Sequence, residues 1–304
     1  MIVPCLNAEA TIAQQLEALI SQQLAEPWEL IIADNGSTDR TIEIAKTFEK
    51  RFADFRIINA GGSRQLPAHA RNVGARAARS DSLAFCDADD EVAPGWVASM
   101  VHALTSYDVV CGQFRFDKFN NSLVAKKSAQ AWKDGLYKGR FLPGGGSGNF
   151  GIKRWLHETI GGFDECLPHG EDADYFWRLQ LEGFTLHYEP KAIVEVRVGR
   201  IKPSLPYLYR RSRNRVASNL WSYKRYRSLG MIPPPTLGES FMKWLHILRK
   251  ACSILLASKP KRLSLVEQLT IQTGDLMGQV KGRLTNPCKP YWPGQIGKRK
   301  GKTG

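Results

Sequence analysis

Four carboxylates within five residues form the clearest chemical signal in this sequence, Asp87-Ala88-Asp89-Asp90-Glu91, directly after the apolar run 83–86. Carboxylates at this density repel one another unless a cation lies among them. Their hard oxygen atoms suit Mg²⁺ or Mn²⁺, and a diphosphate could supply further oxygen ligands. A helix dipole would account for one or two of these acids, not for four at the end of a strand. We therefore interpret Asp87 and Asp89 as a divalent-metal site.

A second carboxylate, Asp34, ends the apolar run 30–33 and opens the turn Asp34-Asn35-Gly36-Ser37-Thr38-Asp39. Asp34 could accept hydrogen bonds from a base or a ribose, and Gly36 lets the backbone approach a ligand. The alternative is an ordinary turn in which Ser37 or Asp39 caps the following helix. The two interpretations use different atoms, so both can hold.

A second Asp-Ala-Asp occurs at Asp172-Ala173-Asp174, where the turn Pro168-His169-Gly170 precedes an aromatic-rich helix. Its acids are therefore expected in the first helical turn. A carboxylate there that faces a cleft could take a proton from an attacking hydroxyl. Stabilisation of the helix dipole explains the same acids equally well.

The elements that must position these acids alternate in type along the first 115 residues. Apolar runs predict strands over 1–3, 30–33, 55–59, 83–86 and 109–114, and helical spacing predicts helices over 12–20, 41–52, 68–79 and 96–104. This alternation indicates a parallel sheet with helices on both faces. Ligands of such sheets bind beyond the carboxyl ends of the strands, where Asp34 and Asp87 lie.

Taken in order, several segments resemble the family 2 glycosyltransferases of the GT-A fold, of bacterial type. The matching segments are Pro4-Cys5-Leu6-Asn7-Ala8-Glu9, Asp34-Asn35-Gly36-Ser37-Thr38-Asp39, Ala70-Arg71-Asn72-Val73-Gly74, Asp87-Ala88-Asp89-Asp90, Gly148-Asn149-Phe150, Ile160-Gly161-Gly162-Phe163-Asp164-Glu165 and Glu171-Asp172. The resemblance covers about residues 1–198. It implies a doubly wound, mixed but mostly parallel α/β sheet, here followed by a basic helical extension.

The resemblance also implies a function: inverting, hexosyltransferase-like transfer of a sugar from a nucleotide-diphosphate donor to a hydroxyl of a glycan or lipid-linked acceptor. It assigns the nucleoside to Pro4, Asn7 and Asp34. It places Arg71 near the base or phosphates, Asp87 on the ribose side, and Asp89, with Asp87, at Mn²⁺ or Mg²⁺. Asp172 would be the general base.

The sequence departs from the family in two places. The first strand is short, so we expect either a trimmed strand or a natural start upstream of Met1. Many relatives also carry a histidine after the strand that follows a Tyr-x-Pro turn, whereas Tyr188-Glu189-Pro190 leads here to Glu195-Val196-Arg197. A third metal ligand from that region is therefore not expected. The glycines at 144–148 lack the ending of a P-loop and favour a flexible loop bordering the acceptor cleft.

The formal charge of +14 over 304 residues is unevenly distributed. Residues 1–199 hold 21 basic and 26 acidic side chains, whereas residues 200–304 hold 22 and 3. We therefore expect a glycosyltransferase domain over 1–198 and a basic, mainly helical region over 199–304, disordered at 298–302.

Three uses of the basic region remain open. Aromatic and basic residues interleave over 207–227, and apolar residues then recur at helical spacing, with Lys243 and Lys250 opposite: Phe241, Trp244, Leu245, Leu248, Cys252 and Leu255. An anionic membrane surface is favoured, followed by packing onto the body of the protein, with nucleic acid last. The resulting interpretation is a cytoplasmic enzyme of cell-envelope polysaccharide synthesis, peripheral at the inner face of the membrane. The alternative is a non-catalytic sugar-nucleotide or nucleic-acid binding protein that acts through the basic tail.

Composition excludes several other classes. An apolar content of 43% with 10% aromatics excludes an intrinsically disordered chain. The six cysteines are scattered without a CxxC pair, which argues against a zinc site or a disulfide framework and fits a reducing cytosol. We expect no signal peptide and no membrane span, because no apolar run reaches roughly 18–20 residues. Donor base, sugar, acceptor and oligomeric state are not determined by any motif.

Overall fold

The computed structural model describes residues 1–62, 65–120, 123–198, 204–251 and 259–287. Their contacts divide into two compact units. The first, the sheet unit, comprises Met1–Glu165 and Glu171–Val198. The second, the helical unit, comprises Cys166–Gly170 and the described part of Gly199–Tyr291.

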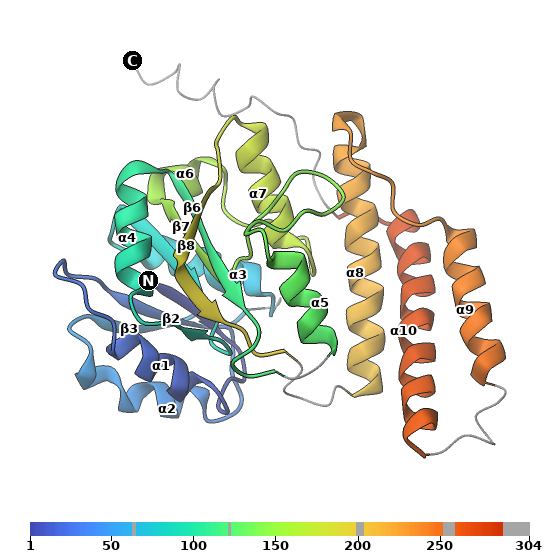
Figure 1. Ribbon diagram of the computed structural model, residues 1–304, viewed down its shortest axis with the longest axis horizontal. Helices are drawn as coiled ribbons and strands as arrows, with labels where there is room; N and C mark the ends of the chain where they lie inside the picture. The colour runs from blue at the N-terminus through green and yellow to red at the C-terminus, as the bar shows by residue number, and fades with distance from the viewer. Residues whose placement is uncertain (63–64, 121–122, 199–203, 252–258, 288–304) are drawn as a thin grey trace. The chain divides into compact units, whose positions relative to one another are not determined.

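The sheet unit is built on eight strands in the order β3-β2-β1-β4-β7-β6-β8-β5 (Figure 1). Neighbours β3, β2, β1 and β4 are parallel, as are β6 and β8, whereas β7 runs antiparallel to β4 and β6, and β5 to β8. The predicted mixed, mostly parallel sheet is confirmed. The strands are β1 Ile2–Cys5, β2 Leu30–Asp34, β3 Phe55–Asn59, β4 Ser82–Cys86, β5 Glu91–Val92, β6 Val109–Arg115, β7 Asn149–Lys153 and β8 His187–Glu195.

Seven α-helices accompany these strands in the described part of the sheet unit: α1 Ile12–Ile20, α2 Thr41–Thr47, α3 Pro67–Ala77, α4 Trp96–Ser106, α5 Leu123–Trp132, α6 Arg154–Thr159 and α7 Glu171–Leu181. Helix α3 begins one residue earlier than predicted, at Pro67, whose ring suits the first helical turn. The single helix expected over 41–52 ends at Thr47 and is followed by the 3₁₀ turn Glu49–Arg51.

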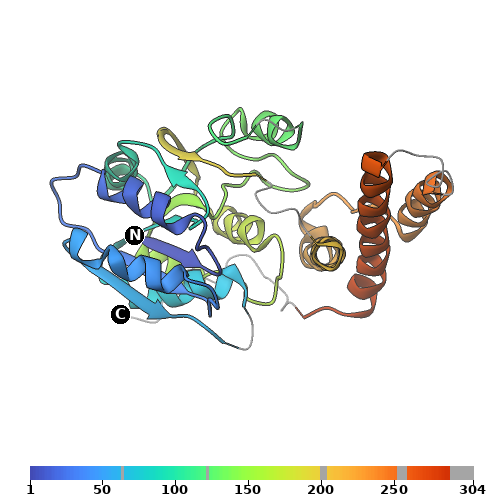
Figure 2. The same ribbon diagram turned by 90° about the horizontal axis from the view of Figure 1, so that it is seen from below.

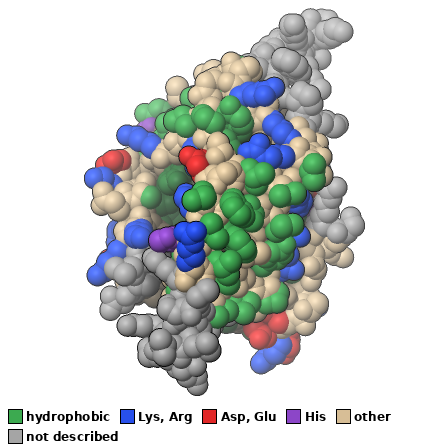
Figure 3. All heavy atoms as spheres, turned by 90° about the vertical axis from the view of Figure 1, so that its right-hand side faces the viewer, with side chains coloured by type: hydrophobic (Ala, Val, Ile, Leu, Met, Phe, Trp, Pro, Cys, Tyr) green, Lys and Arg blue, Asp and Glu red, His purple; other side chains and the backbone are tan. Residues whose placement is uncertain are grey.

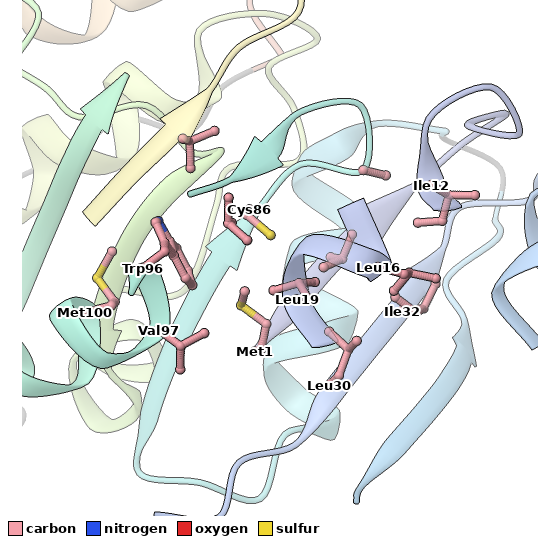
Figure 4. Packing of buried hydrophobic residues seen from close by; sticks show 14 of the residues in the cluster. Met1, Ile12, Leu16, Leu19, Leu30, Ile32, Cys86, Trp96, Val97 and Met100 are labelled. Carbon is pink, nitrogen blue, oxygen red and sulfur yellow. The ribbon is translucent and has the colours of Figure 1, made fainter. Parts of the chain in front are cut away.

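The core forms two apolar layers because successive strand residues point to opposite faces of the sheet. Val3 and Cys86 face α1, α2 and α4, whereas Ile2 and Phe85 face α3, α6 and α7. Figure 4 shows the first layer, in which Leu16 of α1 lies against the strands. Burial of each large apolar side chain stabilises the fold by about 1.5–3 kcal/mol, so the layers hold the loops at the strand ends in place.

The helical unit consists of α8 Leu205–Tyr226, the 3₁₀ turn Arg227–Leu229, α9 Leu237–Ala251 and α10 Lys259–Leu284 (Figure 2). Leu167, from the short segment Cys166–Gly170, packs against Ala217 and Trp221 of α8. In the described part of the chain no helix is both long and apolar enough to cross a bilayer. Of the predicted features, Cys252, Leu255 and residues 298–302 lie outside the described residues.

Candidate active site

The central strands bring the predicted ligand residues to one edge of the sheet. Strand β1 lies between β2 and β4 and is parallel to both, and its Cys5 pairs in register with Asp34. The segment that follows β1 therefore lies beside Asp34, and Asp87 follows β4 on the other side. This is the carboxyl edge, where open α/β sheets bind ligands.

The loop after β2 is braced by Asn7. Asn7 adopts a left-handed conformation with φ 52°, and its Oδ1 accepts a hydrogen bond from the Thr38 backbone at 2.8 Å. Its own backbone N–H donates to Ser37 Oγ at 3.0 Å, while the Ser37 N–H donates to Asp34 Oδ1 at 3.1 Å. Asn7 thus positions the loop that carries Asp34, a role that its motif alone did not indicate.

Asp39 fulfils the alternative prediction for this segment, an ordinary turn in which a side chain caps the following helix. Its Oδ1 accepts a hydrogen bond from the Thr41 N–H at 3.0 Å, at the start of α2, and its Oδ2 accepts one from the Glu9 N–H at 3.1 Å. Of the two expected capping residues, Asp39 therefore bonds the helix start, while Ser37 contacts Asn7 and Asp34. Capping and ligand binding remain compatible here, because Asp34 is not needed for the cap.

Asp87, Asp89 and Asp90 form a compact acidic cluster after β4. Each offers one carboxylate oxygen, and these oxygens lie within 4.8 Å of one another. Asp87 is half-buried, Asp89 exposed and Asp90 buried. Burial, together with repulsion from Asp89 and Asp87, raises the pKa of Asp90 well above its ordinary value. Three oxygens at this separation fit a single hard divalent cation, so the donor set suits Mg²⁺ or Mn²⁺.

Arg197 secures this acidic loop from the end of β8. Its N–H donates to Asp90 Oδ1 at 2.9 Å, and its guanidinium donates to Glu91 Oε2 at 3.3 Å and to the Asp89 carbonyl at 3.4 Å. The side chain is only 1% exposed, with the guanidinium 3.8 Å from the ring centroid of Phe119. In the region where the sequence lacks the histidine, the structure places the buried guanidinium of Arg197. Its positive charge offsets part of the negative charge of the acidic cluster.

Arg71 of α3 connects the two acidic motifs. The buried guanidinium donates to Asp87 Oδ1 at 2.6 Å and to Glu171 Oε1 at 3.4 Å. Burial lowers the pKa of Arg71, but Asp87 and Glu171 outweigh it and raise that pKa overall, so the group stays charged. Arg71, which was expected near the base or phosphates of the donor, thus links the acidic loop after β4 to the first residue of α7 through its two carboxylate contacts.

Asn72, the neighbour of Arg71, fixes the segment before α7. Its Nδ2 donates to the Phe163 carbonyl at 2.9 Å and to Glu165 Oε1 at 2.8 Å, and the Phe163 N–H donates back to Asn72 Oδ1 at 2.8 Å. Two motifs that lie about 90 residues apart in sequence therefore form one hydrogen-bonded junction. This junction holds the segment that contains Phe163 and Glu165 against α3.

The two aspartates of the second Asp-Ala-Asp differ in environment. Asp174 is fully buried and bound to Arg178 at 2.8 Å, and Arg178 in turn donates to the carbonyls of Ile160 and Gly162. Asp172 is half-buried, and its Oδ1 accepts a hydrogen bond from the Ala173 N–H at 2.7 Å. Asp174 is therefore a structural residue, and Asp172 is the candidate for proton transfer.

Gly148 is a site residue whose role the sequence did not reveal. A Cβ at this position would lie 2.5 Å from Asp87 Oδ2, so only glycine fits beside that carboxylate. The whole stretch 144–148 is buried, and a Cβ on Gly146 would lie 2.6 Å from Phe114. The expected flexible loop is instead a packed segment, because its missing side chains leave room for those of its neighbours.

Glu171 makes protein stability depend on pH near neutrality. Burial, followed by repulsion from Asp172, raises its pKa from 4.5 to about 7. Between these values the folded state binds more protons than the unfolded state, so the free energy of unfolding falls as pH rises. Glu171→Gln removes this titration. We expect the variant to gain stability relative to the wild type between about pH 5 and about pH 8, by at most about 3 kcal/mol.

Melting temperatures measured across this range with EDTA present check the prediction. The comparison isolates Glu171 because every other titrating group is shared by the two proteins. A difference in melting temperature between Glu171→Gln and the wild type that stays constant across this pH range would contradict the assignment.

The mixed α/β sheet with acidic motifs at its carboxyl edge is the architecture of a GT-A glycosyltransferase, and the family comparison agrees. The model of Glycosyl transferase family 2 matches residues 1–160, so the chain belongs to glycosyltransferase family 2. It is 36% identical over 144 residues to the uncharacterized glycosyltransferase YfnE of Bacillus subtilis, covering 43% of this chain and 36% of the relative. It is 26% identical over 270 residues to the chondroitin synthase of Escherichia coli, covering 69% and 39%. The chain thus spans little more than a third of the length of these two relatives.

Solved structures confirm the GT-A fold. The mannosyltransferase PcManGT from Pyrobaculum calidifontis superposes with a TM-score of 0.62 at 18% identity, over 93% of this chain and 86% of that one. TarS of S. aureus, residues 1–349, superposes with a TM-score of 0.53 at 16% identity, over 93% and 90%. Both likenesses extend well beyond the 160 residues that the family model matches.

Proposed function

We propose that this protein transfers a sugar from a nucleoside-diphosphate donor to an acceptor hydroxyl, with inversion at the sugar carbon and with a divalent metal. One observation carries the proposal: buried Arg71 holds Asp87, from the acidic cluster, and Glu171, the neighbour of Asp172, in a single site. A cation site and a candidate base thereby lie within reach of one substrate. Membership of family 2 supports the same reaction class.

The donor end of the site is assigned to the loops after β1 and β2. Pro4, Asn7 and Asp34 would contact the nucleoside, with Asn7 acting at least through the loop that it braces. Asp89, with Asp87, would hold Mn²⁺ or Mg²⁺, which would offset the charge of the departing diphosphate. Two structural neighbours support a donor of this class, since PcManGT was solved with GDP-Man and Mn²⁺ and TarS with UDP.

Asp172 would act on the acceptor. As the acceptor oxygen forms its bond to the sugar C1, its proton passes to an Asp172 carboxylate oxygen, and the bond from C1 to the diphosphate oxygen breaks on the opposite face. A single displacement inverts C1 and needs no protein nucleophile. The buried thiols fit this scheme, because burial raises the pKa of Cys5, Cys86 and Cys111 and keeps them in the unreactive protonated form.

The acceptor and the location extend the proposal. We assign the acceptor to a polysaccharide or a lipid-linked glycan, and the enzyme to the cytoplasmic face of the cell membrane as a peripheral protein. Two curated relatives are named as synthases of polysaccharides, chondroitin and hyaluronan, which supports an acceptor of this class. The basic residues of 200–304 support the location, and nucleic acid ranks last among partners.

Turnover of a panel of nucleotide sugars, with Mn²⁺ or with EDTA, tests the function. We expect release of nucleoside diphosphate from one donor class, abolished by EDTA and lowered by about 10²–10³-fold in Asp89→Ala, because the cation then loses its exposed ligand. Asp108→Ala, at an exposed aspartate outside the site, should match the wild type.

The same measurements decide against the proposal in two ways. Full turnover in Asp89→Ala would remove the metal assignment. Binding of donors without turnover, in the presence of metal and a range of glycan acceptors, would favour the alternative of a non-catalytic sugar-nucleotide binding protein.

A further inference from the structure

Helix α10 meets α8 through glycines rather than through large apolar side chains. Gly274, Gly278 and Gly282 recur every four residues and therefore share one face of the helix. A Cβ on Gly274 would lie 2.6 Å from the Tyr209 carbonyl oxygen, and one on Gly278 would lie 2.6 Å from that of Arg213. The backbones approach too closely to admit side chains, a mode of packing common between helices in membranes. Consequently the bulky apolar residues of α10 lie on its other faces.

Those other faces are only partly covered by α9. Trp244 of α9 donates its indole N–H to Thr273 Oγ1 of α10 at 3.0 Å, which fixes the contact between the two helices. Half-buried apolar residues of α10 remain on the side away from the glycines: Leu265, Leu269, Leu276 and Val280. These residues share the side of α10 that carries Thr273, so the contact with α9 covers them in part and leaves each of them partly exposed.

Helix α9 adds an exposed apolar surface of its own. Leu237, Phe241, Leu245 and Leu248 recur at intervals of four and three and form one stripe along the helix, which we call the α9 stripe. Phe241 is 45% exposed, and the neighbouring Met242 is 60% exposed. Figure 3 shows hydrophobic side chains gathered in a continuous band over this face, with Lys and Arg side chains at its edges.

The net positive charge of the helical unit indicates what kind of surface would cover this hydrophobic band. Residues 204–287 contain 15 Lys and Arg but only three acids, Glu239, Glu267 and Asp275. Asp275 is already paired with Arg215 at 2.8 Å. A second copy of the chain would bring like charges together, whereas an anionic bilayer supplies opposite charge at its surface and apolar chains just below. Arg249 is exposed on α9 and can extend toward headgroups beside the stripe, whereas Lys243 is exposed on the opposite side of the helix.

We propose that the α9 stripe and Met242 insert into the interface of an anionic phospholipid bilayer, with Arg249 contacting the headgroups. This rests on the membrane location in the proposed function and names the surface and the lipid that provide it. The helix would lie in the plane of the interface, with Lys243 on the side that faces water.

Co-sedimentation of the full-length protein with vesicles tests the proposal. Vesicles of phosphatidylcholine and phosphatidylglycerol should bind the protein at least about tenfold more tightly than phosphatidylcholine alone. The double variant Phe241→Gln with Met242→Gln should lose at least about tenfold in affinity for the mixed vesicles, because it replaces two exposed apolar side chains of the inserting surface by polar ones. Thermal melts check that the variant remains folded, since Phe241 stacks on Trp244 with ring centroids 5.9 Å apart. Leu284→Gln, at the most exposed large apolar residue described in the helical unit, is the matched control and should bind as the wild type does.

Four outcomes would overturn the proposal. The first is unchanged vesicle binding by the double variant, and the second is a loss of vesicle affinity in Leu284→Gln equal to that in the double variant. The third is that the double variant loses a dimer but still binds vesicles. The fourth is that single-stranded DNA releases the protein from vesicles while the double variant still binds DNA tightly. Donor turnover is measured in parallel without vesicles. Normal turnover with no vesicle binding in the wild type rejects this surface alone, whereas vesicle binding without turnover rejects the catalytic proposal and leaves this one standing.

Discussion

Replacing Asp172 by asparagine is expected to lower kcat on the order of a thousandfold while leaving the melting temperature unchanged. An amide cannot accept the proton of the acceptor hydroxyl, so the loss falls on the chemical step. The fold should tolerate the change, because the Asp172 carboxylate accepts a local hydrogen bond from the Ala173 N–H that an amide oxygen can accept too. The Asp172 charge also repels Glu171 and attracts Arg71, and these two effects oppose each other. Steady-state kinetics and thermal melts on the same samples measure both effects.

Asp174→Asn provides the matched control, because it makes the same chemical change two residues away. Asp174 is fully buried and holds Arg178, so its variant should lose about 3–5 kcal/mol of stability, and activity should fall only as the folded fraction falls. If Asp172→Asn keeps normal kcat, the assignment of the base is wrong. If Asp174→Asn loses kcat at full stability, the base is Asp174.

Replacing Arg71 by methionine is expected to damage both stability and turnover. The guanidinium is 3% exposed and lies between Asp87 and Glu171, so its removal leaves two carboxylates without their common partner. The cost is about 3–5 kcal/mol in the free energy of unfolding. Lysine should not restore the wild-type properties, because a single ammonium lacks the planar fork that serves two carboxylates. Urea unfolding and donor turnover measure the two effects.

Two further variants make the Arg71 prediction specific. Arg40→Met breaks an ion pair to Glu43 in which both side chains are 70% exposed, and it should leave the stability nearly unchanged. Adding Glu171→Gln to Arg71→Met should recover part of the lost stability, because it removes one of the unpaired carboxylates. Wild-type stability in Arg71→Met would show that the bridge is not needed. Equal losses in Arg71→Met and Arg40→Met would show that the burial of Arg71 has no effect.

Much of the sheet unit could be predicted from local pattern. The run 55–59 coincides with β3, and the runs at 30–33, 83–86 and 109–114 differ from β2, β4 and β6 by only one residue each. Strands β7 and β8 were not predicted, because glycine and proline interrupt their apolar pattern and their pairing depends on distant strands. Helix α10 was missed for a different reason. Its contact with α8 is made by Gly274, Gly278 and Gly282, which have low helix propensity and give no apolar pattern on that face.

The sequence alone determined which residues could do the chemistry, since Asp34, Asp87, Asp89 and Asp172 occur in motifs whose types and order can be read directly. It also indicated the family, because seven short segments follow one another in the expected order. The residue pattern did not distinguish Asp172 from Asp174, and only the family resemblance singled out Asp172. The tertiary structure supplies the physical difference, because it buries Asp174 against Arg178 and leaves Asp172 partly exposed.

The tertiary structure also decided the roles of Arg71, Arg197 and Gly148. Each acts through a partner that lies between 16 and 108 positions away in the sequence, such as Asp87 for Arg71 and the Asp89 carbonyl for Arg197. The type of a residue shows only that its side chain can carry a charge or, for glycine, that it leaves room for a neighbouring side chain. Burial and the nearest opposite charge decide what that charge does, and both come from chain segments that meet only when the sheet and its helices assemble.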